Sequence, residues 1–372
     1  MKSTKVLKSE SMVFSLRELY DKNGYSRYKM NKFEEYDLYA KNKDFLISDE
    51  VITFTDTNGK LMALKPDVTL SIVKNTKDVD ASVQKLYYNE NVYRVSKGTH
   101  SFKEITQVGL EAIGDIDEYC IYEVVSLAAQ SLALTEKNCI LEISHLGILS
   151  DIMNFVGIPK EDTNKAINLI GEKNVHELLA FCESLSTSKE KADLLAKAVK
   201  IYGKPEEVLP WIETNLFGIA NEKNIKTFVN IINALSAEDF GNEIYIDFSV
   251  VDDLRYYNGF VFKGFAEGIP TSILSGGQYD TLMKHMKRSS GAIGFAVYLD
   301  ELQNLNTPNE YDVDVLLIYG ENDDVFALKK IAKELKENGE SVLMQKEIPD
   351  GIKYKKLMKF MYGEVKNIET NA

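Results

Sequence analysis

The sequence predicts an α+β fold in which one antiparallel sheet is flanked by helices and is divided by a helical insertion. Strand-like alternation fills most of residues 45–114 and returns over 244–277. Between these stretches, residues 148–240 carry apolar side chains at spacings of three and four, with Lys and Glu in the gaps, which indicates helices. A single sheet split by a helical insertion is the simplest arrangement that fits this order.

Local signals define the first two elements of this fold. Residues 9–22 place apolar side chains on one helical face, and Asn23-Gly24 provides a left-handed stop. Residues 45–63 alternate between apolar and polar side chains around Asn58-Gly59, which is a strong signal for a two-residue hairpin turn. We therefore expect one amphipathic helix followed by a β-hairpin.

Two longer strands are expected next, at 84–95 and 100–114. Helical spacing follows them up to Leu132, and Asp115 and Glu118 stand at capping-box spacing before that helix. A strand at 139–147 then leads into the helical insertion.

The tail of the chain has a different pattern. After the linker 304–310, a buried type of strand over 311–320, a helical face over 325–335 and a strand over 341–345 form a β-α-β arrangement. Only 27 residues follow Gln345, so a small or incomplete α/β domain is expected. The predicted division is a core of residues 1–147 and 241–303, a helical insertion of residues 148–240, and a truncated α/β segment of residues 311–372.

Composition limits the classes of function. The chain has 372 residues, 44% of them hydrophobic and 27% charged, as in ordinary globular proteins. No apolar run approaches the ~18 residues of a membrane span, and the first 20 residues lack the apolar stretch of a signal peptide. We therefore expect a cytoplasmic protein without membrane association. The formal net charge of −13 argues against general binding of nucleic acids.

The sequence predicts neither a metal site nor a cofactor. The three cysteines, Cys120, Cys139 and Cys182, are widely spaced and are expected to be buried thiols. The four histidines are isolated from one another, as structural or surface residues are. Dinucleotide-binding, P-loop, α/β-hydrolase and zinc-protease motifs are missing from the sequence.

Four short stretches carry polar side chains that could form a binding site. Asp67 and Thr69 are two residues apart, and we expect them on one face of an extended segment. Gln107 and Glu111 alternate around Gly109, which is expected to leave space above the sheet. The other two stretches contain Arg94, in an otherwise apolar strand, and Tyr256 with Tyr257, beside a tight turn.

Each stretch alone is more typical of the wet face of a sheet than of a binding site. Together, their carboxylates, amide and hydroxyls would suit a small zwitterion with a basic ring, because these groups satisfy an ammonium and an imidazole N–H. Histidine has both groups.

The order of the motifs resembles the catalytic core of histidyl-tRNA synthetases. The resemblance extends from the first helix to about residue 303, and the helical insertion falls where that family carries one. It implies a class II aminoacyl-tRNA synthetase-like fold, with a tail that resembles the start of the anticodon-binding domain. The segments that carry it are "KPDVT" (65–69), "KLYYNENVYR" (85–94), "QVGLEAIGD" (107–115), "YYNGFVF" (256–262), "GGQYDTLM" (276–283) and "AIGFAVYLDEL" (292–302).

The resemblance also implies roles for single residues. Arg94 matches the family's arginine that meets the α-phosphate of ATP, and it is expected to remain as an anion or nucleotide contact. The other matching positions hold the amino group and imidazole of histidine, and Tyr256 adjoins them. The candidate histidine-binding residues are therefore Asp67, Thr69, Gln107, Glu111, Tyr256 and Tyr257.

The departures from the family's pattern concern catalysis. Ser96 stands where the second motif has a glutamate, and Asp252 stands where the family has an arginine, with Arg255 three positions on. In the third motif, Tyr298 fills a glycine position and Glu301 replaces the arginine that meets the γ-phosphate. Losing one such stabilising group typically costs ~10² to 10³ in rate. We therefore expect no catalytic residues.

A synthetase-like core with these losses and a short tail resembles the ATP phosphoribosyltransferase regulatory subunits. That resemblance implies a non-catalytic chain that a short-form catalytic subunit requires for the first step of histidine biosynthesis, with histidine as the feedback effector. It also implies self-association as a synthetase-like dimer, and tRNA is not expected as a partner. The alternatives are an active histidine-tRNA ligase, with Arg255 as a relocated arginine, and a free-standing sensor of histidine or tRNA.

Overall fold

The computed structural model describes residues 8–46, 50–78, 82–95, 101–135, 138–251, 256–303, 311–361 and 363–370. These residues belong to two compact units, a large one within Lys8–Asn304 and a small one that contains the tail from Leu305.

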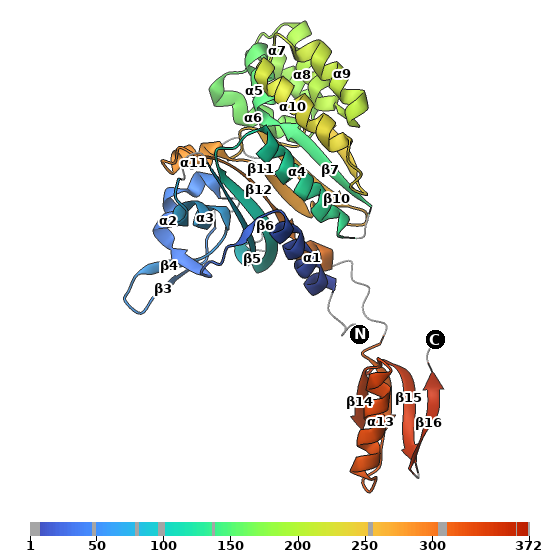
Figure 1. The fold of residues 1–372 in the computed structure, drawn as a ribbon. Helices are drawn as coiled ribbons and strands as arrows, with labels where there is room; N and C mark the ends of the chain where they lie inside the picture. The colour runs from blue at the N-terminus through green and yellow to red at the C-terminus, as the bar shows by residue number, and fades with distance from the viewer. Residues whose placement is uncertain are drawn as a thin grey trace. The chain divides into compact units, whose positions relative to one another are not determined.

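A nine-stranded sheet forms the centre of the large unit (Figure 1). Its central strands are antiparallel, as predicted, but β1 pairs with β5 and β7 pairs with β9 in parallel. A parallel pair needs a crossover connection, and the helices between β7 and β9 provide one. The strand order is β1 (Ser26–Arg27), β5 (Val83–Val95), β6 (Phe102–Gly114), β12 (Gly291–Tyr298), β11 (Leu274–Gln278), β10 (Phe260–Ala266), β7 (Cys139–His145), β9 (Glu243–Asp247) and β8 (Tyr202–Gly203).

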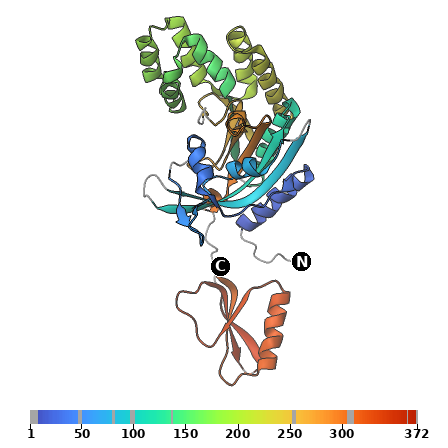
Figure 2. The same ribbon diagram turned by 90° about the vertical axis from the view of Figure 1, so that its left-hand side faces the viewer.

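Alternation along β6 separates the two faces of this sheet. Val108, Leu110 and Ala112 lie in the core that also contains buried residues of α1 (Lys8–Lys22) and α4 (Glu118–Ala133). Ile113 belongs to the other core, with side chains of α3 (Thr69–Asn75) and α11 (Asp280–His285). Figure 2 shows α1 on one side of the sheet and the α2–α3 region on the other. Because Gln107 and Glu111 alternate with Val108 and Leu110, they lie on the face of α3 and α11.

The first helix is as predicted, and a turn lies at Asn58-Gly59. The predicted two-residue turn is wrong, because the N–H of Asp56 donates to the carbonyl of Lys60 at 2.9 Å and three residues lie between them. The helix α1 ends before Gly24, whose φ is 79°, and Gly59 in the hairpin turn also has a φ of 79°. The strand before the turn, β3 (Thr53–Thr55), is shorter than expected, because Lys43–Phe45 form a 3-10 turn (η1) that buries Phe45. The strands β2 (Phe33–Glu35) and β4 (Leu61–Leu64) complete a three-stranded sheet in the order β2-β4-β3, and α2 covers Tyr36–Lys41.

The two helix starts around the insertion depend on polar caps. Asp117, and not the predicted pair of Asp115 and Glu118, caps α4 by accepting the N–H of Cys120 at 2.8 Å. His145 caps α5 through Nδ1, which accepts the N–H of Ile148 at 3.2 Å. Burial lowers the pKa of His145 to about 4, so this histidine is neutral and structural.

Apart from the short strand β8, helices form the chain between β7 and β9, where the insertion was predicted, and Figure 1 shows them gathered at one end of the sheet. In the residues that the structure describes, no helix is long and apolar enough to cross a membrane. The elements are α5 (Leu146–Val156), η2 (Lys160–Asp162), α6 (Thr163–Gly171), α7 (Val175–Ser184), α8 (Lys189–Lys200), α9 (Pro205–Leu216) and α10 (Glu222–Ser236).

The tail forms a four-stranded sheet with one helix. The predicted strands β13 (Val313–Ile318) and β14 (Val342–Gln345) and the helix α13 (Val325–Glu337) are present. The sequence did not predict β15 (Tyr354–Met361) and β16 (Glu364–Thr370), which extend the sheet to the order β14-β13-β15-β16. This unit has its own core, formed by Val315, Leu317, Leu328 and Phe360. The division into core, insertion and truncated domain stays a prediction.

Candidate functional site

Glu111 lies at the centre of a buried polar cluster on the face of α3 and α11. It is 2% exposed, and its two carboxylate oxygens accept hydrogen bonds from Thr69 Oγ1 at 2.8 Å and from the Tyr279 hydroxyl at 2.6 Å. On the neighbouring strand β12, Gly294 provides the space, because a Cβ at that position would overlap the Glu111 carboxylate. Burial raises the pKa of Glu111 to about 8, although the hydroxyl donors oppose this shift.

Asp67 approaches this cluster from a helix start and not from an extended segment, as the sequence predicted. Its Oδ1 accepts the N–H of Leu70 at 2.9 Å, in the first turn of α3, which begins at Thr69. A carboxylate that satisfies a free helical N–H favours this local turn over a strand. Burial raises the pKa of Asp67, and the nearby charge of Arg94 acts in the opposite direction. Arg94 is held beside this segment, where its Nε donates to the carbonyl of Pro66 at 3.0 Å.

Tyrosine rings surround the carboxylates. The ring centroid of Tyr256 lies 4.6 Å from that of Tyr257 and 5.9 Å from that of Tyr279. Burial raises the pKa of Tyr256 and of Tyr279, so both hydroxyls stay neutral donors. The space expected above Gly109 is occupied, because a Cβ there would clash with the hydroxyl of Tyr88. Tyr88 is thus a further buried hydroxyl, and the nearby charge of Glu111 contributes to its raised pKa.

The structure brings most of the predicted site residues together. Asp67, Thr69, Glu111 and Tyr257 all influence Tyr256 electrostatically or by hydrogen bonding, which places these five side chains in one cluster. Gln107 lies on the same strand face as Glu111, is 3% exposed and pairs across the sheet with Tyr298.

Tyr279 and Tyr88 are site residues that sequence reasoning did not single out. Tyr279 stands in the motif segment "GGQYDTLM" and Tyr88 in "KLYYNENVYR", so their place in these motifs could have identified them as candidates. The structure places both beside Glu111, because Tyr88 pairs with Gly109 on β6 and the hydroxyl of Tyr279 donates to Glu111.

The cluster can hydrogen-bond a cationic amine and an N–H-bearing ring. Its carboxylates accept, and its hydroxyls donate or accept. Within the described parts of the chain, no group of three or more His, Cys, Asp or Glu side chains could hold a metal ion. Cys120, Cys139 and Cys182 are buried and unpaired, as predicted.

The segment predicted to have lost its phosphate contacts lies at the end of β12 and in α12 (Leu299–Gln303). Here the Tyr298 hydroxyl and Ser275 Oγ are 2.6 Å apart, and Asp300 accepts the N–H of Thr106 at 2.7 Å. Glu301 accepts a hydrogen bond from the exposed Thr271 hydroxyl at 2.8 Å. These polar groups are engaged by their own neighbours. The predicted departures at Ser96, Asp252 and Arg255 fall outside the described residues.

Comparisons with known proteins agree with this arrangement of motifs. A family model described as histidyl-tRNA synthetase matches residues 2–302. The ATP phosphoribosyltransferase regulatory subunit of Oceanobacillus iheyensis is 26% identical over 346 residues, which cover 91% of this chain and 85% of the relative. The protein of the same name from Clostridium botulinum (strain 657 / Type Ba4) is 32% identical over 326 residues, covering 82% of this chain and 75% of the relative.

Solved structures share the fold at lower identity. A Bacillus halodurans protein described as an ATP phosphoribosyltransferase regulatory subunit/histidyl-tRNA synthetase has a TM-score of 0.71 at 22% identity, covering 93% of this chain and 91% of that chain. The ATP phosphoribosyl transferase (HisG:HisZ) complex from Thermotoga maritima matches with a TM-score of 0.62 at 20% identity, covering 80% and 98%. Together, these comparisons show that the chain belongs to the histidyl-tRNA synthetase family and, within it, is an ATP phosphoribosyltransferase regulatory subunit.

Proposed function

We propose that this chain binds histidine in the cluster around Glu111 and transmits feedback inhibition to a separate, short-form catalytic subunit of ATP phosphoribosyltransferase. The catalytic subunit would carry out the first step of histidine biosynthesis and would need this chain for activity. The names of the relatives support the regulatory role. The observation that carries the ligand assignment is the buried Glu111 with its two hydroxyl donors.

Histidine suits the chemistry of this cluster. Its ammonium and one ring nitrogen are donors, and Asp67 and Glu111 supply buried carboxylate acceptors. An ammonium near Glu111 would favour the ionised carboxylate, so binding would release the proton that burial retains in the empty site. The tyrosine hydroxyls can then orient the ligand without adding charge.

The end of β12 and the start of α12 match the synthetase segment that contacts the phosphates of ATP, and we call this segment the former phosphate side. Its side chains support a regulatory role over a catalytic one. Adenylate formation depends on positive groups placed around the phosphorus centre. Asp300 and Glu301 are acids, and both are held by hydrogen bonds to neighbouring groups of the protein. These residues provide no positive charge for a triphosphate.

Self-association is part of the proposal. On the three-stranded sheet, Phe33 and Phe54 are 47% and 38% exposed, and their rings meet edge to face at 5.6 Å. Exposed aromatic pairs of this kind are typical of interfaces. We infer a synthetase-like dimer and a cytoplasmic location, without a tRNA or membrane partner.

The test is reconstitution with a short-form catalytic subunit. Adding this chain should raise transferase activity, and histidine should then inhibit it. A catalytic subunit whose activity does not respond to this chain would contradict the proposal. Histidine-dependent pyrophosphate exchange with ATP, measured on this chain alone, would instead indicate a working histidine-tRNA ligase.

A further inference from the structure

The two hydroxyl donors to Glu111 come from the starts of two separate short helices. Thr69 is the first residue of α3, and Tyr279 is the N-cap of α11. Each donates to a different oxygen of the carboxylate, at 2.8 Å and 2.6 Å, and side chains of both helices share one hydrophobic core. The carboxylate is therefore held on both sides only while the two helix starts keep their separation.

At the other ends of these helices, Arg288 joins the two. It follows Lys287, whose φ of 59° turns the chain at the end of α11, and its own N–H donates to the carbonyl of Met283 at 2.9 Å. Its Nη1 donates to the carbonyls of Val73 and Thr76 at 2.7 Å and 2.8 Å. Because the last carbonyls of a helix lack intrahelical partners, this side chain closes the end of α3 from the side of α11.

Asp78 holds the guanidinium of Arg288 in this place. The Nε of Arg288 lies 2.7 Å from Oδ1 of Asp78, and Ser289 and Ser290 also donate to this carboxylate. The hydrogen bonds from Ser290 and Arg288 keep the pKa of Asp78 well below its usual range, so the pair stays charged at neutral pH. The Arg288 side chain is 12% exposed, and we call this arrangement the Arg288–Asp78 clamp.

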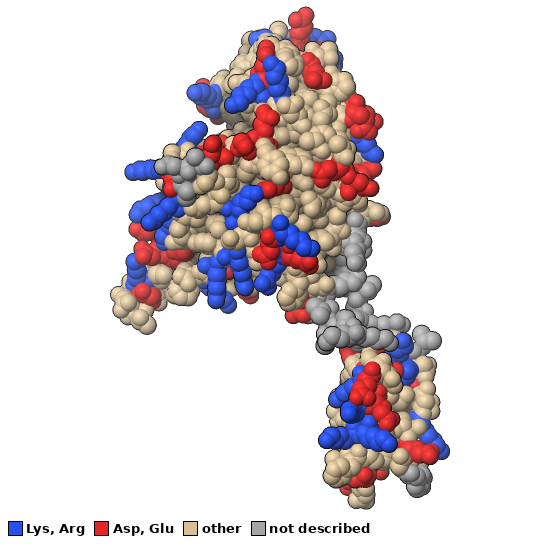
Figure 3. Space-filling model, in the orientation of Figure 1, with Lys and Arg blue, Asp and Glu red and all other residues tan. Residues whose placement is uncertain are grey.

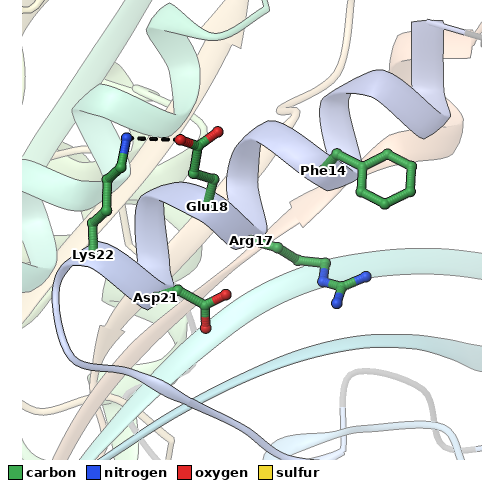
Figure 4. A pocket seen from close by; sticks show the side chains of 5 residues that line it. All are labelled: Phe14, Arg17, Glu18, Asp21 and Lys22. Atoms are coloured by element: carbon green, nitrogen blue, oxygen red, sulfur yellow. Dashed lines mark ion pairs between the residues drawn. The ribbon is translucent and has the colours of Figure 1, made fainter.

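A surface ion pair alone would be ordinary. On the face drawn in Figure 3, acidic and basic side chains are interspersed, and exposed pairs of this kind contribute little to stability. Figure 4 shows one beside an open pocket on α1, where Lys22 and Glu18 lie 2.8 Å apart within a single helix. The Arg288–Asp78 clamp differs, because it connects the segments after α3 and α11 and also satisfies backbone carbonyls of α3.

We propose that the Arg288–Asp78 clamp positions the two donors of Glu111 and thereby sets the affinity of the cluster for its ligand. A carboxylate can follow one donor that moves, but it cannot follow two donors that move apart. Loss of the clamp therefore loosens the hydrogen bonds that orient Glu111 toward a cationic group. The choice of histidine as the ligand rests on the proposed function, whereas the clamp itself rests on contacts between described residues.

The test is calorimetry of histidine binding to Arg288→Ala, Asp78→Asn and the control Lys173→Met. Lys173 follows α6 and lies 2.7 Å from Asp247 at the end of β9, so the control also breaks a link between two elements. Arg288→Ala should weaken the dissociation constant by about tenfold, as if one hydrogen bond to Glu111 were lost. Asp78→Asn keeps an acceptor oxygen and should weaken it by about threefold, and the control should stay within about twofold.

A second background separates positioning from a merely structural role. In Thr69→Val only the donor from Tyr279 remains, and Glu111 can follow it. Adding Arg288→Ala to Thr69→Val should therefore change the dissociation constant by less than about twofold, which is a coupling between the two positions. Urea denaturation of Arg288→Ala and Lys173→Met checks that both variants fold and lose comparable stability.

The results that contradict the account are distinct. If the wild type binds no histidine, the proposed function fails, and the clamp has no such ligand to serve. If the wild type binds and Arg288→Ala binds equally well, the clamp proposal alone is wrong. A tenfold loss that persists in the Thr69→Val background would also overturn it, because the effect would not pass through the two donors. If Arg288→Ala does not fold, a wild-type dissociation constant in Asp78→Asn contradicts the clamp.

Discussion

The two sides of the synthetase-like site differ in burial and in what their acids do. On the amino-acid side, Glu111 is buried and is held by two hydroxyl groups that converge on it. On the former phosphate side, Asp300 and Glu301 lie in partly exposed positions, and each accepts one hydrogen bond from a neighbour in the protein. On the same pair of strands, β6 and β12, a buried carboxylate cluster is thus followed by a segment whose acids are partly exposed.

Under the proposed function, this difference separates the part of the synthetase-like site that binds a ligand from the part that does not. Burying a carboxylate destabilises the fold, because burial opposes its charge. Binding of a cationic ligand would offset this cost. The outer acids are stabilised by ordinary local contacts and need no ligand. On that proposal, ligand recognition persists without catalysis.

The largest expected effect comes from removing the central carboxylate. Glu111→Ala should weaken histidine binding by about 100-fold, because hydrogen bonds to charged groups contribute ~1.5–3 kcal/mol and the buried donors lose their acceptor. Isothermal titration calorimetry measures this directly. Glu301→Ala is the matched control and should bind like the wild type. Equal losses in both variants would remove the distinction between the two sides.

A pair of isosteric substitutions tests the same distinction through stability. Thr69→Val leaves one oxygen of buried Glu111 without its donor and should lower the free energy of unfolding by ~1–3 kcal/mol. Thr271→Val removes an exposed donor to Glu301 and should cost less than ~0.5 kcal/mol. Urea denaturation of both variants provides the measurement. An equal loss of unfolding free energy in both variants would mean that the burial of Glu111 does not make its hydrogen bond stronger than that of Glu301.

The smallest effect concerns pH. Burial raises the pKa of Glu111 to about 8 in the folded chain, so between pH 4.5 and 8 the folded state holds a proton that the unfolded state has released. The free energy of unfolding should therefore fall as pH rises through this window. His145 has the opposite effect below pH 6.5, because its pKa is lowered to about 4.

The pH effect is best measured without histidine between pH 6.5 and 8, where the contribution of His145 fades and is the same in every variant. The decline in the free energy of unfolding should amount to roughly 1 kcal/mol more in the wild type than in Glu111→Gln. Glu301→Gln should keep the wild-type slope. A wild-type slope in Glu111→Gln would assign the titration to another group.

The sequence predicted the parts of the fold that local patterns specify. The alternation over 83–114 gave the two long strands, and Asn23-Gly24 and Asn58-Gly59 marked real turns. The strand β15 was missed because frequent lysines in "KYKKLMKFMY" hide its two buried residues, Leu357 and Phe360. The strand β16 was missed because it contains no buried residue and so shows no apolar alternation.

The site was predicted as a set of residues but not as a geometry. Asp67 and Thr69 were expected in a strand, and the local hydrogen bond from Leu70 instead starts a helix there. The contact of Tyr279 with Glu111 joins residues 168 positions apart, so only the assembled sheet brings them together. The motif order included the segment that contains Tyr279, but it could not show that this side chain contacts Glu111.

The most direct measurement is histidine inhibition of the reconstituted transferase, with this chain either as the wild type or as Glu111→Ala. The expected result is that both forms activate the catalytic subunit, that histidine inhibits the wild-type complex, and that the complex with Glu111→Ala stays active at the same histidine concentrations. Equal inhibition of both complexes would place the effector elsewhere and contradict the assignment of the Glu111 cluster.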